Sequence, residues 1–502
     1  MTRRPNILIV CTDQQRTDTL SCYGARHIDT PGFDRIAREG VRFTRAYAPS
    51  AVCTPSRVSL LSGQYAGRHK VWSIGVNTGD DVRMMQHDLA ADGYRTALIG
   101  KAHLEAYQVP PEQSRESVAG FERGYGDWSG PYYGFQQVQL ALGHVNYGMT
   151  GHYGAWLRER FTEAQIEGFK HLIPRSNTPS FGGEGYDWDL PVAAHNSVWA
   201  ADRAVDYIGR QDGTAPFFLF VSFQDPHHPH ALPRDYANRI RPDAIPQPRY
   251  SEGELDDRPE HFRLAREGRL QGSRYVGSSW PMSGQGHGAD FRQVSRSAAV
   301  DGRRQYYGMA ALIDDQLPRI WAALEAAGLY DDTLIIVTSD HGELLGDHGL
   351  WMKGPFHYEE VIRVPLLMKP PADMCSPSYE RGWDEPVSLV DICPTCLHVA
   401  GIARPPELDG VSLLHPERNR HVLVETVQEW HALSCLSIIG SQHKFTCYPE
   451  ENFGELTDFD RDPFEQTNRF AAEPETRSEM LQALMSLQYG FNRSPKTRIG
   501  YA

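Results

Sequence analysis

The residues best suited to catalysis stand in one short motif, Cys53-Thr54-Pro55-Ser56-Arg57, which the helix-like stretch Val58–Gly63 follows. A cysteine at the start of a helix lies where free backbone N–H groups and the helix dipole favour an anion. Arg57, one turn further on, can direct its guanidinium toward an oxyanion beside that cysteine. The motif therefore indicates a nucleophile in an anion-binding site. The alternative interpretation is a buried thiol next to a surface arginine.

Six further motifs with metal-ligating, cationic or turn residues are spread over nearly the whole chain. They are Asp13-Gln14, Gly100–Leu104, Asp225–His230, Ser339–Glu343, Gly346–Leu350 with Lys353-Gly354, and Glu455–Asp462 with Glu465. Together with the Cys-x-Pro-x-Arg motif, these blocks and their order resemble the formylglycine-dependent sulfatase family of the alkaline phosphatase superfamily. The resemblance is closest to the choline sulfatase and phosphonate monoester hydrolase branch.

The resemblance implies one bound divalent metal ion, Ca²⁺ or Mn²⁺, with the nucleophile at Cys53 completing its coordination. Its other ligands would be Asp13, Gln14, Asp340 and His341. In the commonest sulfatase pattern, Gln14 would be a second aspartate and His341 an asparagine. With one carboxylate and one oxygen ligand replaced, we expect weaker calcium binding and easier acceptance of manganese, iron or zinc.

The resemblance also implies that a formylglycine-generating maturation enzyme oxidises Cys53 to formylglycine (3-oxoalanine). The hydrated aldehyde offers two hydroxyls on one carbon. One hydroxyl attacks the sulfur or phosphorus with help from the metal and displaces the alcohol. The other hydroxyl then loses a proton, and the resulting collapse to the aldehyde releases the anion.

Cationic and histidine side chains are expected to support this chemistry. Arg57, Lys101 and Lys353 can surround the non-bridging oxygens of a tetrahedral oxyanion. His227 is the candidate general acid for the leaving alcohol, with Lys353 as the alternative. His103 is the candidate that triggers the collapse step, because histidine titrates near neutrality.

One further substrate contact is suggested by the resemblance alone. Asn77 lies a short loop beyond the nucleophile helix and is similar to a substrate-binding asparagine of the phosphonate hydrolases.

These residues need a scaffold, and the sequence predicts an α/β fold with a large, mostly parallel sheet between layers of helices, as in alkaline phosphatase. Asp13 and Asp340 each follow a continuous apolar run, which is the pattern of a buried parallel strand with its ligands at the C-terminal end. Helix and strand patterns alternate from there on. We expect a catalytic domain over residues 1–415, with insertions near 105–190 and 235–296, and a smaller α+β domain over 416–502.

Composition and charge exclude several function classes. The net charge of −14 argues against nucleic acid and anionic membranes as partners. The absence of a long apolar run or signal peptide from the sequence leads us to expect a cytoplasmic protein with no membrane partner. Cys393 and Cys396 lie in a predicted apolar helix, so we interpret them as buried structural thiols.

The sequence thus favours hydrolysis of alkyl, aryl or sugar sulfate monoesters. The alternative is a phosphonate or phosphate mono- or diester hydrolase that uses the same formylglycine, or an enzyme that accepts both classes of ester. An inactive binding protein is disfavoured because all the predicted ligands and the nucleophile are present, and a phosphatase with an unmodified nucleophile stays open. A homo-oligomer, dimer or tetramer, is expected, to which the tail 492–502 could contribute.

Overall fold

The fold is given by a computed structural model of the 502-residue chain. It describes residues 4–144, 149–171, 173–174, 185–276, 290–374, 382–429 and 433–491.

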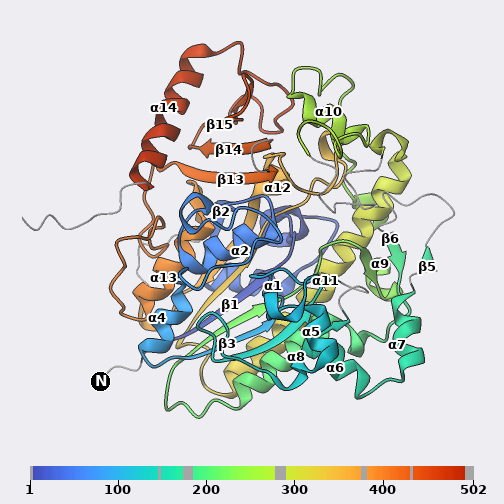
Figure 1. Ribbon diagram of the computed structural model, residues 1–502, viewed down its shortest axis with the longest axis vertical. Coiled ribbons are helices and arrows are strands. Elements are labelled where there is room, and N and C mark those ends of the chain that lie inside the picture. The colour runs from blue at the N-terminus through green and yellow to red at the C-terminus, as the bar shows by residue number, and fades with distance from the viewer. Residues whose placement is uncertain are drawn as a thin grey trace, which may run out of the picture.

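A large, mostly parallel sheet forms the centre of the molecule (Figure 1). Its strands follow the order β11-β2-β10-β9-β1-β7-β3-β4, and β12 pairs with β2 as well. Strands β4, β3, β7, β1 and β9 pair in parallel, whereas β10 runs antiparallel to both β9 and β2. The strands are β1 (Asn6–Thr12), β2 (Val41–Tyr47), β3 (Arg95–Gly100), β4 (Gln137–Leu142), β7 (Phe217–Ser222), β9 (Thr333–Ser339), β10 (Arg363–Lys369), β11 (Gly382–Trp383) and β12 (Val387–Ser388).

Helices cover both faces of the sheet, as the continuous apolar strands predict. Along β1, Ile7 and Ile9 pack into the core on one face, whereas Leu8 and Val10 pack into the core on the other. The first face is covered by α2 (Cys53–Ser62), α4 (Met85–Ala91) and α13 (Ile392–Val399). The second face is covered by α1 (Pro31–Glu39), α8 (Asn196–Gly209) and the long α11 (Arg296–Ala326). This arrangement confirms the predicted α/β class.

A second, smaller layer lies at the C-terminal end of the chain, drawn in orange and red at the top of Figure 1. It is an antiparallel sheet with the order β13-β14-β15-β16, and Met480 and Leu484 of α14 pack against it. Its elements are β13 (Val422–Glu429), β14 (Leu433–Ile439), β15 (His443–Cys447), β16 (Gly454–Asp458) and α14 (Pro474–Phe491). The predicted α+β character of this region is confirmed, whereas the exact domain boundary stays a prediction.

The two predicted insertions carry shorter elements. The segment near 105–190 also includes β4, which is the edge strand of the main sheet. Its other elements are α5 (Val118–Arg123), α6 (Gly151–Arg158), α7 (Glu163–Lys170), β5 (Ile173–Pro174) and β6 (Gly185–Asp187). The segment near 235–296 follows β8 (His230–Leu232) and includes α9 (Arg234–Arg239) and α10 (Glu260–Arg266). The remaining short helices are α3 (Ala66–His69) and α12 (Glu359–Ile362).

Two further expectations concern burial and membranes. Cys393 and Cys396 are 1% and 0% exposed in α13, as expected of structural thiols. Within the described ranges, no helix has the length and apolar character needed to cross a bilayer.

Candidate active site

The site begins where β1 and β9 end side by side. Their parallel register pairs Cys11 with Thr338 and Thr12 with Ser339, so Asp13 and Asp340 leave the sheet next to each other. The backbone N–H groups of Gln14 and His341 both donate to Asp340 Oδ1 at 3.0 Å. The four side chains that follow the two strands, those of Asp13, Gln14, Asp340 and His341, are 0% exposed.

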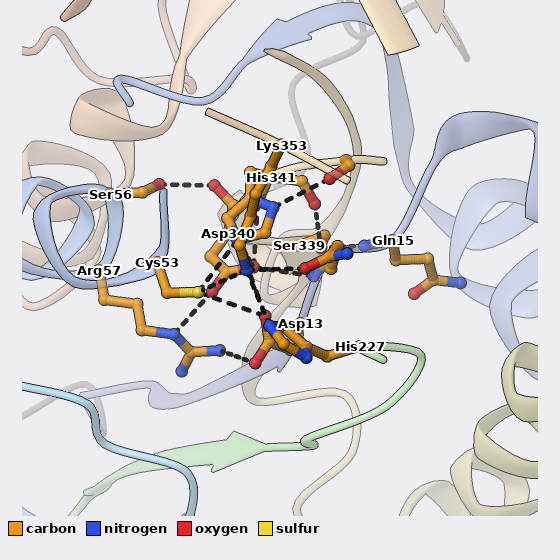
Figure 2. Close-up of polar contacts among 12 residues, drawn as sticks. Asp13, Gln15, Cys53, Ser56, Arg57, His227, Ser339, Asp340, His341 and Lys353 are labelled. Carbon is orange, nitrogen blue, oxygen red and sulfur yellow. Dashed lines mark hydrogen bonds and ion pairs between the residues drawn. The ribbon is translucent and has the colours of Figure 1, made fainter. Parts of the chain in front are cut away.

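Cys53 lies across from these strand ends, at the first residue of α2 (Figure 2). Its Sγ atom is 3.1 Å from His341 Nε2, 3.1 Å from Lys353 Nζ and 3.8 Å from Asp13 Oδ1. Burial raises the pKa of the Cys53 thiol, but the charges of Lys101 and Lys353 outweigh this effect and hold it well below its usual value. The predicted nucleophile thus faces the predicted ligands.

The donor set fits one divalent cation. Asp13, Cys53, Asp340 and His341 each offer a ligand atom, and these atoms all lie within 4.8 Å of one another. The ring of His341 is oriented by its Nδ1, which is 2.9 Å from the carbonyl oxygen of Gly342, so Nε2 is left to face Cys53. Carboxylates and imidazole together suit Mn²⁺, Fe²⁺ and Zn²⁺, and the carboxylates also suit Ca²⁺.

Three cations surround the same space. Arg57 Nε donates to Asp340 Oδ2 at 2.7 Å, and its Nη1 donates to Ser222 Oγ at 2.8 Å. Its buried Nη2 makes no hydrogen bond to the described residues and lies 3.9 Å from Asp13 Oδ2. Lys101 Nζ bonds to Asp13 Oδ2, and Lys353 Nζ reaches Gln14 Oε1 at 2.6 Å. The site thus combines fixed cations with one guanidinium N–H group that is not used in a hydrogen bond and can donate to an incoming anion.

Two of the predicted histidines also reach this space. His227 Nε2 is 2.8 Å from Lys353 Nζ, and its Nδ1 is 2.6 Å from the carbonyl oxygen of His228. His103 is 5% exposed, and both of its ring nitrogens lack a hydrogen-bond partner among the described residues. A buried imidazole with both nitrogens unsatisfied is costly, so both ring nitrogens of His103 are available to a bound molecule.

With this geometry established, comparison with known proteins decides the family. The sequence model of the sulfatase family matches residues 5–402. The chain belongs to the sulfatase family. The model of the N-sulphoglucosamine sulphohydrolase C-terminal region matches residues 346–489, which include the small antiparallel sheet.

Individual sulfatases and a related hydrolase resemble the chain over most of its length. The arylsulfatase of Clostridium perfringens is 26% identical over 99% of this chain and 98% of its own. The choline-sulfatase of Rhizobium meliloti is 27% identical over 93% and 82%, respectively. The crystal structure of the phosphonate monoester hydrolase of Agrobacterium radiobacter is 27% identical, with a TM-score of 0.78 over 97% of this chain and 96% of that one. The protein is therefore a hydrolase of the sulfatase family.

The structure adds one histidine to this sulfatase site that sequence reasoning missed. His144 stacks on His227 with ring centroids 3.6 Å apart and planes at 8°. Its Nε2 lies 2.7 Å from Lys101 Nζ and 3.2 Å from Asp13 Oδ2. Burial and the charge of Lys101 lower the pKa of His144 to about 4. Its position just after β4, at the carboxyl end of a parallel strand, is the signal that could have revealed it.

Asn77, which the family resemblance suggests as a substrate contact, uses both polar atoms of its side chain in hydrogen bonds outside the site. It is exposed; its Oδ1 accepts from the N–H of Ala106 at 2.8 Å, and its Nδ2 donates to the carbonyl of Gln113 at 2.7 Å. These bonds fix the loop after β3, and the substrate role of Asn77 stays a prediction.

Proposed function

We propose that the protein hydrolyses sulfate monoesters of alkyl, aryl or sugar alcohols, using a formylglycine derived from Cys53 and one divalent metal ion, Ca²⁺ or Mn²⁺. The observation that carries the proposal is the convergence of Cys53 Sγ with the ligand atoms of Asp13, Asp340 and His341. When bound, the metal and the hydrated aldehyde would together supply an activated hydroxyl nucleophile at neutral pH.

The fixed cations account for binding of the sulfate group. Arg57 is held by Asp340 and Ser222 through Nε and Nη1, so its Nη2, which makes no hydrogen bond to the described residues, can donate to a non-bridging oxygen. Lys101 and Lys353 contribute two further positive charges beside Cys53. Because the site is buried, these charges act in a medium that screens them less than water does.

The pair formed by Lys353 Nζ and His227 Nε2 is the proposed proton source for the leaving alcohol. Burial and the neighbouring His144 hold the pKa of His227 well below its usual value, so its ring is neutral in the free enzyme. Its Nδ1 proton bonds to the carbonyl of His228, which leaves Nε2 to accept from Lys353. A proton on the lysine ammonium can therefore reach the alcohol directly or through the imidazole.

Phosphonate or phosphate mono- or diester hydrolysis is the second candidate function. Two observations favour it, namely the Gln14 and His341 ligand pair and the likeness to the phosphonate monoester hydrolase of Agrobacterium radiobacter. Both reactions pass through a similar trigonal-bipyramidal oxyanion, so the same cations serve either one.

The decisive experiment compares kcat/KM for para-nitrophenyl sulfate and para-nitrophenyl phenylphosphonate, after reconstitution with calcium and then with manganese. Because the leaving group is shared, the ratio reports how the site treats sulfur and phosphorus. A preference for the sulfate supports the first proposal, and a preference for the phosphonate moves the protein to the second. If neither is cleaved although mass spectrometry finds formylglycine at position 53, both proposals fail.

The proposed partners follow from this chemistry. They are a small sulfate or phosphonate ester, the maturation enzyme that converts Cys53, and further copies of the same chain in a dimer or tetramer. We propose a cytoplasmic location. We also propose that the protein has no nucleic-acid or membrane partner, because its net charge of −14 disfavours binding to anionic surfaces. Sedimentation of the full-length chain and of a chain ending at residue 491 would test the oligomer and the role of the tail.

A further inference from the structure

The amide of Gln14 lies between a cation and a carboxylate. Its Oε1 accepts from Lys353 Nζ at 2.6 Å on the side of the active site. Its Nε2 donates to Glu343 Oε2 on the opposite side and also lies 3.3 Å from His228 Nδ1. The backbone of Gln14 has a φ of 64° and is fixed as well, because its carbonyl accepts from Tyr306 Oη at 2.5 Å. The side chain is 0% exposed.

The carboxylate of Glu343 is itself fixed by hydrogen bonds from backbone N–H groups. Its Oε1 accepts from the N–H of Leu345 at 3.1 Å and from the N–H of Met352. The carbonyl of Glu343 accepts from Arg16 Nη1 at 3.1 Å, and its side chain is 1% exposed. With one oxygen committed to the loop, only Oε2 is directed at Gln14.

This arrangement decides which end of the amide faces the site. An ionised carboxylate only accepts hydrogen bonds, so it selects the NH₂ end of the Gln14 amide. The carbonyl end must then point toward Lys353, Cys53 and the ligand atoms. A reversed amide would bring two acceptors together at Glu343 and an NH₂ group toward any bound cation, and both contacts are unfavourable.

We propose that Glu343 is a positioning residue, which locks the amide oxygen of Gln14 toward the metal and places a third carboxylate directly behind that neutral ligand. The inference rests on the proposed metal site. Outer carboxylates that orient a ligand also raise its basicity, so Glu343 strengthens a ligand that carries no charge of its own. The alternative role for Glu343 is to close the loop between Leu345 and Met352 without any influence on the metal.

A charge swap separates these two roles. In Glu343→Gln, the new amide oxygen can keep both backbone donors, but its NH₂ group faces Gln14 and forces that amide to turn round. We expect Mn²⁺ binding to weaken by about 10- to 100-fold. In the double variant Gln14→Glu with Glu343→Gln, a carboxylate at position 14 accepts from the new NH₂ group and still directs one oxygen to the metal. We expect this variant to recover Mn²⁺ affinity to within about threefold of the wild type.

The measurement is isothermal titration of Mn²⁺ into chelator-stripped full-length protein, with the unfolding temperature recorded for each variant. Glu254→Gln is the matched control, because Glu254 is a buried carboxylate that bonds to His348 and to none of the proposed ligands. It should bind Mn²⁺ like the wild type.

Each outcome has a distinct meaning. A wild type that binds neither Mn²⁺ nor, in a parallel titration, Ca²⁺ overturns the proposed metal site, and the inference with it. A wild type that binds Mn²⁺ no more tightly than Glu343→Gln overturns the inference alone. If the double variant binds Mn²⁺ as weakly as Glu343→Gln does, the role of Glu343 is only to close the loop between Leu345 and Met352. Should Glu343→Gln fail to fold, the swapped variant still decides by whether it recovers Mn²⁺ affinity.

Discussion

Two adjoining regions of the molecule use their polar side chains differently. The inner centre, formed by Asp13, Gln14, Cys53, Asp340 and His341, directs its polar groups at one another and at the surrounding cations. In the outer segment, residues 105–133, polar side chains bond mainly to backbone. Glu116, for example, accepts from the N–H groups of His103, Leu104 and Glu105. We therefore propose that the inner centre determines the reaction, whereas the outer segment determines the shape around it.

That shape includes a surface hollow. A depression of about 610 Å³ lies in the outer segment, and its lining includes Tyr107, Pro110, Pro111, Val118, Glu122 and Arg123. Tyr107 also lines a small cavity shared with Lys101, His103 and His144. The outer segment therefore adjoins the side chains that we propose to be catalytic. The following predictions test this division, from the largest expected effect to the smallest.

Replacing the nucleophile should have the largest effect. Cys53→Ala is expected to lower kcat by about 10⁴- to 10⁶-fold, because no other described side chain occupies the same position among the ligands. Activity is measured with the better of the two para-nitrophenyl esters. Cys22→Ser is the control, since Cys22 is only partly buried and lies outside the inner centre. Full activity in Cys53→Ala would assign the reaction to a different nucleophile.

His103 is predicted to take part in the chemistry, although Glu116 of the outer segment holds its backbone. His103→Asn should lower kcat by about 10²- to 10⁴-fold, because a proton-transfer group is lost. The unfolding temperature should change little, since the ring makes no hydrogen bond to the described residues. The exposed His398→Asn serves as a control. An unchanged kcat would place His103 with the structural residues of the outer segment.

His348 lies in the loop that follows His341, and its ring bonds to the carboxylates of Glu254 and Glu360. The free energy of unfolding should therefore depend on pH through His348. Burial lowers the pKa of His348, but these two carboxylates outweigh burial and raise it to about 9. A raised folded-state pKa gives stability that is fully present below about pH 6.5 and is lost as the pH rises through about 9.

The loss should be on the order of 3 kcal/mol. Urea unfolding across this pH range measures it, and His348→Gln should flatten the profile. A wild-type profile as flat as that of the variant would contradict the assigned ion pairs.

Tyr107 tests whether the outer segment contacts the leaving group. Tyr107→Ala should raise KM about tenfold for esters with a large leaving group, because an aromatic contact of about 1.4 kcal/mol is lost. The smallest alkyl esters should be unaffected, and Tyr125→Phe provides a control within the same segment. An equal loss for all esters would show that Tyr107 acts on the reaction itself.

Asn77 should give the smallest effect. Asn77→Ala is expected to reduce the free energy of unfolding by about 1 kcal/mol, because two bonds to backbone are lost. The value of kcat/KM should stay within about threefold of the wild type, a change of less than about 1 kcal/mol. A large rise in KM with unchanged stability would instead support the substrate contact that the family resemblance suggests.

The sequence could predict the parts of the site that follow from local strand patterns, but not those that depend on contacts between distant residues. Asp13 and Asp340 each follow an apolar strand, and parallel strands bring their carboxyl ends together, so their proximity was predictable. The roles of His144 and Glu343 depend on contacts with Asp13 and Gln14, which lie far away in the chain. Local patterns carry no information about such pairings. The sequence predicts an insertion near residues 105–190, although strand β4 within that range forms the edge of the main sheet.

The burial of the nucleophile helix has a consequence for how the protein is made. All ten residues of α2 are buried, and Cys53 is 1% exposed. A modifying enzyme cannot surround that thiol once the sheet and its helices have assembled. If Cys53 is converted to formylglycine as proposed, the conversion would have to compete in time with folding, and the yield of active protein would depend on how quickly the nascent chain reaches the modifying enzyme.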